Sequence, residues 1–185
     1  MLIKKLFWAS RMFILSLFYK NIRFPGYMGP PILLMGFDKV KMDKRVRIFP
    51  NARFEVHGDG IIDIKDNVSI GQGFHVTSKG HLEIGSGTVI SGNVIVTNID
   101  HEYQDVSKPV LEQPYIVRNT TISENCFIGF GVVIQAGTKL GRHCVVGANS
   151  VVRGDFPDYC VIVGAPARIV KRYDLEQKIW VRVDG

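Results

Sequence analysis

Aliphatic residues recur at every sixth position through the C-terminal half of the chain. Two positions before each of the last six stands a small or β-branched residue. The N-terminal half repeats the spacing less regularly, and between Val76 and Ile84 it widens to eight, which predicts a short loop near 78–80. The aliphatic series is Ile116, Ile122, Ile128, Ile134, Leu140, Val146 and Val152, and the small series is Thr120, Cys126, Val132, Thr138, Cys144 and Ser150.

A period of six excludes an α-helix, because six residues of helix turn through about 600° and the aliphatic residues would not share a face. Short strands with alternating side chains, separated by tight turns, do place residues i and i+6 in equivalent positions. Stacking such strands buries a continuous interior column. The pattern therefore predicts a parallel β-helix built from hexapeptide repeats.

The repeat stops between Asn98 and Tyr115, a polar stretch with two prolines and one histidine, His101, and we expect it to resume at Ile116. The regular coils of a β-helix stack into a prism with flat faces, so a cleft requires a loop that leaves the prism. Loops on a rigid scaffold commonly carry function. His101 is thus the first candidate for a catalytic residue.

Three segments, "NIDHEYQD", "ENCFIGFGVVIQAGTKLGRHCVVGANSVV" and "VIVGAPARIVK", make the chain resemble the hexapeptide-repeat acyltransferases from about Ile62 to Lys171. Within this family, the chain resembles the galactoside and maltose O-acetyltransferases and the polysaccharide O-acetyltransferases. The resemblance implies an all-β fold, a left-handed parallel β-helix with an N-terminal helix, an inserted loop and a short C-terminal tail or helix. Its left hand is implied by the resemblance alone, because crossover connections generally favour the right hand.

The same resemblance implies an acetyl-CoA-dependent O-acetyltransferase that acts on a sugar hydroxyl, in bacterial surface polysaccharide biosynthesis. His101 would be the general base, because imidazole titrates near neutral pH and can accept the proton of an attacking hydroxyl. Acetyl-CoA would be the co-substrate, and no metal is expected. The residues implied for the cofactor are Phe127, Gly129, Phe130, Ala148, Arg153, Arg168 and Lys171, and those for the acceptor sugar or the orientation of His101 are Thr77, Asp100 and Glu102.

Three other functions remain open at this stage. The scaffold could N-acetylate a nucleotide-linked amino sugar, bind zinc as a carbonic anhydrase does, or serve as a solenoid without catalysis. The identity of the acceptor is left open. A homotrimer with active sites between subunits is expected from the resemblance.

We expect three segments: an amphipathic helix over 1–24, the β-helix over 25–170 with its loop at 98–115, and a tail over 171–185. Basic and apolar residues mix in the first segment. Its apolar face could pack on the protein body or on another subunit, or could make a peripheral membrane contact through residues 1–23.

The chain has a net charge of +6 but no zinc-finger spacing or aromatic–basic RNA-binding motif, so no nucleic acid partner is expected. Its three cysteines, an odd number, suggest no disulfide framework. We therefore expect a cytoplasmic protein, or one peripheral on the inner face of the membrane.

Overall fold

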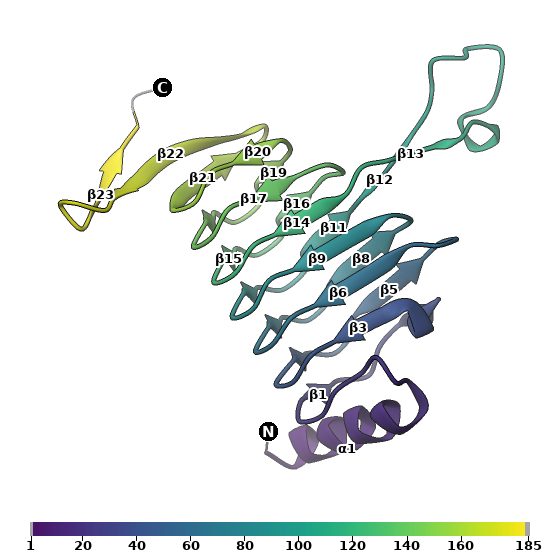
Figure 1. Ribbon diagram of the computed structural model, residues 1–185. Helices are drawn as coiled ribbons and strands as arrows, with labels where there is room; N and C mark the ends of the chain where they lie inside the picture. The colour runs from purple at the N-terminus through teal and green to yellow at the C-terminus, as the bar shows by residue number, and fades with distance from the viewer. Residues whose placement is uncertain (1, 184–185) are drawn as a thin grey trace.

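The computed structural model describes residues 2–183 and shows a parallel β-helix whose coils stack from the N-terminus to the C-terminus (Figure 1). Each coil visits three sheets in turn. The first sheet has the order β1 (Tyr27–Met28), β4 (Arg47–Ile48), β7 (Ser69–Ile70), β10 (Val89–Ile90), β15 (Phe127–Ile128), β18 (Val145–Val146), β21 (Cys160–Gly164), β22 (Ala167–Asp174) and β23 (Ile179–Arg182).

The other two sheets have six strands each. The second contains β2 (Leu33–Met35), β5 (Arg53–Val56), β8 (His75–Ser78), β11 (Ile95–Thr97), β16 (Val133–Ile134) and β19 (Val151–Val152). The third contains β3 (Val40–Met42), β6 (Ile61–Ile64), β9 (His81–Ile84), β14 (Thr120–Ile122), β17 (Lys139–Leu140) and β20 (Asp155–Phe156). Short 3-10 helices lie at η1 (Phe37–Lys39) and η2 (Val110–Glu112).

The interior of the prism confirms the six-residue repeat. The aliphatic residues from Ile122 to Val152 and the small residues from Thr120 to Ser150 are buried. Their stacking follows the register, in which Ile122 pairs with Leu140 and Ile134 with Val152. Burial of these columns stabilises the fold together with the buried apolar residues of the N-terminal coils.

The prediction was wrong for Ile116, which lies outside the interior column. It belongs to β13 (Tyr115–Val117), which pairs antiparallel with β12 (Ile99–His101). These two strands form the base of a hairpin that projects from the prism, and the coil resumes only at β14 (Figure 1). The alternation of a strand continues through Ile116, so the spacing alone did not distinguish the hairpin from the coil.

The C-terminal segment is a pair of antiparallel strands instead of the expected tail or helix. β22 pairs with β21, the last strand of the prism, and β23 pairs with β22. Residues such as Ile169, Val170, Tyr173 and Trp180 favour extended structure, and the free edge of β21 offers backbone groups to pair with.

The helix α1 (Leu2–Phe18) lies across the N-terminal end of the prism (Figure 1). On the side of the helix that faces the prism, Met12 is fully buried. On the same side, the centroid of the Trp8 ring lies 5.9 Å from that of Tyr27 and 5.8 Å from that of Phe49. The helix thus packs one apolar face on the first coil, and packing on the protein body was one of the possibilities that the sequence left open. Within residues 2–183, no helix is long and apolar enough to cross a membrane.

Candidate active site

His101 ends β12, at the corner where the chain leaves the second sheet for the third. It faces Tyr115 across the hairpin, with 4.8 Å between ring centroids and 60° between ring planes. Its Nδ1 atom is buried and has no hydrogen-bond partner among residues 2–183. Nε2 is therefore the ring nitrogen left to meet a substrate.

The acids on either side of His101 shape the loop and do not hold the imidazole. An oxygen of Asp100 accepts a hydrogen bond from the backbone N–H of His101 at 3.0 Å. The Glu102 carboxylate accepts bonds from the backbone of the next two residues. The other Asp100 oxygen lies 3.6 Å from Arg153 and 4.0 Å from Arg118. Asp100 and Arg153, both candidates from the sequence, therefore meet at this corner.

Asn98 anchors the base of the hairpin. It is fully buried, and its side chain accepts a bond from the backbone N–H of Lys79 and donates one to the hydroxyl of Ser78, each at 2.9 Å. Its backbone carbonyl accepts a bond from the N–H of Arg118 across the hairpin. These bonds fix where the chain leaves the prism, and hence where His101 lies.

Three residues that the sequence did not single out gather at this corner around Tyr115, which is one of them. Tyr115 contacts His101 directly. The Lys79 ammonium lies 4.6 Å from the centre of the Tyr115 ring, and the centroid of the His57 ring lies 6.2 Å from that of Tyr115. These residues come from different coils, so no local motif groups them. The only signal in the sequence is the position of Tyr115 at the predicted end of the break, immediately before Ile116.

The outer face of the second sheet continues this polar surface. Thr77 bonds to the Nε2 of His75 at 3.1 Å, and the same nitrogen lies 3.1 Å from a Glu55 oxygen. Burial raises the pKa of Glu55, but hydrogen bonds and charge from Arg53 and His75 outweigh this effect and lower it. Glu55 is therefore an ionised acceptor, and the surface offers hydroxyl, imidazole and carboxylate groups to a polyhydroxylated ligand.

Most of the candidate cofactor residues lie at a different corner. Phe130 and Ala148 lie where the chain passes from the first sheet to the second, before strands β16 and β19 begin. His101 lies at the other side of the second sheet, after strand β11 has ended. A Cβ on Gly129 would lie 2.7 Å from the backbone N of Ala148, so glycine permits the close stacking of these coils. The rings of Phe127 and Phe130 are 47% and 50% exposed, and both can contact a ligand.

Arg168 and Lys171 form a third location, on β22 at the C-terminal end of the prism. Arg168 is exposed, and Lys171 pairs with Val161 in the sheet. The candidate residues thus divide between the His101 corner, the Phe130 corner and the C-terminal strands. One chain alone does not bring the three groups together.

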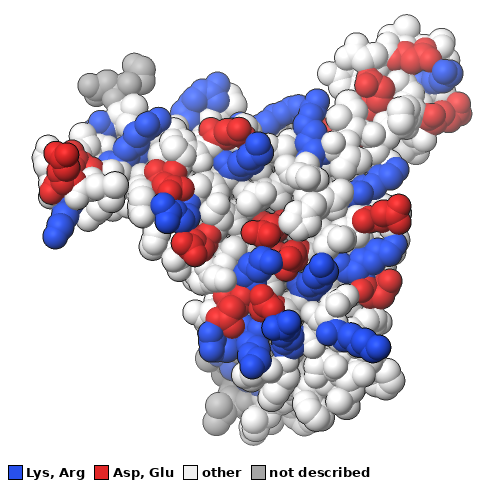
Figure 2. Space-filling view, viewed as in Figure 1, with Lys and Arg blue, Asp and Glu red and all other residues white. Residues whose placement is uncertain are grey.

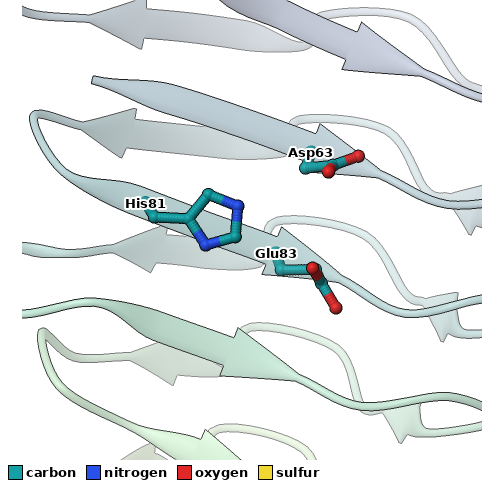
Figure 3. Close-up of side chains that lie close together, drawn as sticks. All are labelled: Asp63, His81 and Glu83. Atoms are coloured by element: carbon teal, nitrogen blue, oxygen red, sulfur yellow. The ribbon is translucent and has the colours of Figure 1, made fainter. Parts of the chain in front are cut away.

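Asp63, His81 and Glu83 form the one group of at least three ligand-type side chains in residues 2–183 whose ligand atoms lie within 4.8 Å of one another (Figure 3). Asp63 projects from β6 and the other two from β9. The Lys65 ammonium already lies 2.7 Å from Asp63 and 3.8 Å from Glu83, and its pKa is raised chiefly by the bond to Asp63. Lysine therefore supplies the positive charge that a metal would bring.

Comparisons with known proteins agree with this fold. Residues 119–154 match the family described as bacterial transferase hexapeptide (six repeats). An Escherichia coli (strain K12) protein named "Putative lipopolysaccharide biosynthesis O-acetyl transferase WbbJ" is 32% identical over 177 residues, which cover 88% of this chain and 85% of that protein.

Two other proteins acylate, by name, an amino sugar or an amine. The dTDP-4-amino-4,6-dideoxy-D-glucose acyltransferase of Escherichia coli is 30% identical over 138 residues, 72% of this chain and 71% of that one. The crystal structure of AntD, an N-acyltransferase from Bacillus cereus, in complex with dTDP and 3-hydroxybutyryl-CoA, superposes with a TM-score of 0.79 over 92% of each chain, at 15% identity. The AntD match shows a shared fold.

Proposed function

The chain belongs to the hexapeptide-repeat bacterial transferases, and we propose that it transfers an acetyl group from acetyl-CoA to a hydroxyl of a sugar in a surface polysaccharide or its precursor. The observation that carries the proposal is the position of His101, which lies on a hairpin at the one long break in the coils of residues 2–183 and whose Nδ1 is buried, so that Nε2 is the nitrogen we assign to the substrate. The similarity to the WbbJ protein over most of both chains supports a hydroxyl as the acceptor.

His101 acts as the general base. Its Nε2 takes the proton of the acceptor hydroxyl as that oxygen attacks the thioester carbonyl. The resulting tetrahedral intermediate collapses, the C–S bond breaks, and the imidazolium returns the proton to the departing sulfur. A base positioned in this way contributes typically about 10² to 10⁴-fold to the rate.

The acceptor lies against the polar outer surface of β5 and β8. Thr77, His75 and Glu55 form a connected chain of hydrogen-bonding groups there, and His57 and Lys79 border it beside Tyr115. Donors and acceptors in this arrangement suit the hydroxyl groups of a sugar.

The complete site forms between subunits of a homotrimer. The His101 corner of one subunit faces the Phe130 corner of its neighbour, and acetyl-CoA lies in the groove between them. Phe127 and Phe130 cover the apolar part of the cofactor, and Arg168 and Lys171 approach its phosphates. The separation of these groups within one chain supports this assembly, and closed threefold symmetry produces three equivalent grooves.

N-acylation of a nucleotide-linked amino sugar is the second candidate. The similarity to the dTDP-amino-sugar acyltransferase over about seven-tenths of both chains favours it. The transfer of an acyl group is the same, but an amine that is already neutral requires less help from a base. Both candidate functions use a coenzyme A donor, and the three cysteines are free. Both therefore fit a protein that works in the cytoplasm.

A panel of acceptors tests the proposal. Purified protein is incubated with acetyl-CoA and with free sugars, nucleotide-linked sugars, nucleotide-linked amino sugars or polysaccharide fragments, and the released thiol is measured. Mass spectrometry of the product locates the acetyl group. Alkali-labile esters on a sugar support the proposal, whereas amides formed only with amino sugars support the second candidate. If no acceptor in the panel raises the rate of thiol release above the rate measured without acceptor, the result contradicts both candidates.

A further inference from the structure

The helix α1 carries apolar residues on two opposite faces. Trp8, Met12 and Leu15 turn toward the first coil. A second stripe with helical spacing faces away from the protein, and its side chains are 49% to 78% exposed. The members of this outer stripe are Ile3, Leu6, Phe7, Phe13, Ile14, Leu17 and Phe18.

Phe24 extends the outer stripe beyond the end of the helix. Its ring packs edge to face against Phe13, with 5.7 Å between centroids, and is itself 44% exposed. Figure 2 shows the same end of the molecule as a mostly uncharged surface, with charged residues gathered above it. A continuous apolar surface of this kind generally marks a contact site.

The charge of this segment favours an anionic partner. Residues 1–28 contain five basic residues and no acidic one. The Arg11 side chain donates to the Met28 carbonyl, and the Lys5 ammonium lies 5.4 Å from the centre of the Tyr27 ring, so both of these turn toward the protein. Lys4 and Lys20 are exposed, near the two ends of the outer stripe.

The same charges disfavour a second copy of the chain as the occupant. Two copies joined end to end by a twofold axis would bring identical patches together. Like charges would then face each other, and the segment has no acidic residue to pair with them. A lipid surface with anionic headgroups meets both the apolar stripe and the lysines.

We propose that the outer stripe of α1 docks the protein on the surface of an anionic membrane. The helix lies flat across the end of the prism, so its phenylalanines can enter the boundary between headgroups and acyl chains while Lys4 and Lys20 contact phosphates. The His101 hairpin projects from a coil nearer the other end, and docking leaves it open (Figure 1). The inference stands on α1 alone and goes beyond the proposed acetyl transfer.

Vesicle flotation tests the docking. The full chain is mixed with vesicles of phosphatidylcholine alone, or of equal parts phosphatidylcholine and phosphatidylglycerol. We expect it to float with the anionic vesicles and much less with the neutral ones. Phe7→Ser combined with Leu17→Ser should weaken partitioning at least about tenfold. Lys4→Glu combined with Lys20→Glu should weaken binding to the anionic vesicles and reduce its sensitivity to salt.

Val106→Ser combined with Leu175→Ser is the matched control, because it removes two exposed apolar side chains outside α1 and should float like the wild type. Circular dichroism confirms that each variant is folded. Wild-type protein that stays with neither vesicle, or flotation that survives the Phe7 and Leu17 changes, overturns the proposal. So does self-association in the absence of lipid that these two changes abolish, because it identifies a second copy as the occupant. Thiol release with a soluble acceptor, measured on the same variants, separates failure of docking from failure of the proposed activity.

Discussion

The imidazole of His101 and the phenol ring of Tyr115 lie edge to face, 4.8 Å apart between centroids, because the antiparallel pairing of β12 and β13 sets the two residues opposite each other. The ring of Tyr115 is held in turn beneath the Lys79 ammonium. Tyr115 therefore restricts the orientation of the imidazole that the proposed mechanism requires.

Replacement of Tyr115 should change turnover more than binding. Tyr115→Phe keeps the ring and should remain within a few-fold of the wild type. Tyr115→Ala frees the imidazole and should lower kcat about tenfold, with the KM for acetyl-CoA nearly unchanged. Steady-state kinetics with each substrate varied separately measures the split. An equal loss in both variants would assign the effect to the hydroxyl and not to packing against His101.

Removal of the base should nearly abolish catalysis without unfolding the protein. We expect His101→Ala to lower kcat at least about 10²-fold and to leave coenzyme A binding, measured by calorimetry, close to that of the wild type. His81→Ala, which removes a histidine from the outer face of the third sheet, is the control and should retain activity. Near-native turnover in His101→Ala would refute the assignment.

Mixed oligomers should reveal a site shared between subunits. His101→Ala removes the base, and Ala148→Arg places a bulky charge at the cofactor corner, so each variant alone should be nearly inactive. Subunits of both kinds, unfolded together and refolded, should regain part of the activity, because some grooves combine an intact His101 with an intact Ala148.

Sedimentation equilibrium supplies the control for this experiment, with about three times the 20.7 kDa chain mass expected for each variant and for the mixture. Trimers that mix without any recovery of activity would place the whole site within one subunit.

The cysteine column should make the protein less stable in alkali. A hydrogen bond between the thiols of Cys126 and Cys144 raises the pKa of Cys126 and lowers that of Cys144. Burial raises the pKa of Cys126 further and is the main cause that raises the pKa of Cys160, so the prediction concerns these two thiols. Folded and unfolded chains both keep these protons at neutral pH. Above the ordinary thiol value of 9.0, the unfolded chain loses them first, so the free energy of unfolding falls as pH rises.

The loss should reach up to about 1.4 kcal/mol per pH unit for each thiol. Thermal unfolding between pH 7 and pH 10 measures it. Cys126→Ala combined with Cys160→Ala should be less stable at neutral pH, because two buried side chains are shortened, yet show a shallower decline. A decline as steep as that of the wild type would exclude the thiols as its cause.

The coil corner at Gly129 should not accept a side chain. The Cβ of Gly129→Ala would lie 2.7 Å from the backbone N of Ala148 and 2.8 Å from the Val146 carbonyl, and neither can move without shifting a coil. We expect a loss of about 1–3 kcal/mol in the free energy of unfolding, measured with denaturant. Gly92→Ala, whose nearest contacts are 3.3 Å away, should lose less. Equal stability of the two variants would show that the coils can separate at little cost.

The sequence by itself determined the repeat. The columns from Ile122 to Val152 and from Thr120 to Ser150 are buried as their spacing predicts, because side-chain alternation is a local property of a strand. The break that carries His101 was equally visible, because no residue in it continues the column with the right partners two positions earlier. The apolar character of α1 could also be predicted from its periodicity.

Only the tertiary structure decided which groups meet. His57, Lys79 and Tyr115 come together because coils stack and a hairpin folds back, and neither contact is encoded in a local period. Ile116 has the right spacing but pairs antiparallel, and the C-terminal residues became strands because β21 left an open edge. The exposed stripe of α1 follows from the same cause: both faces are apolar, and packing against the first coil selected the face of Met12, which left the other to solvent.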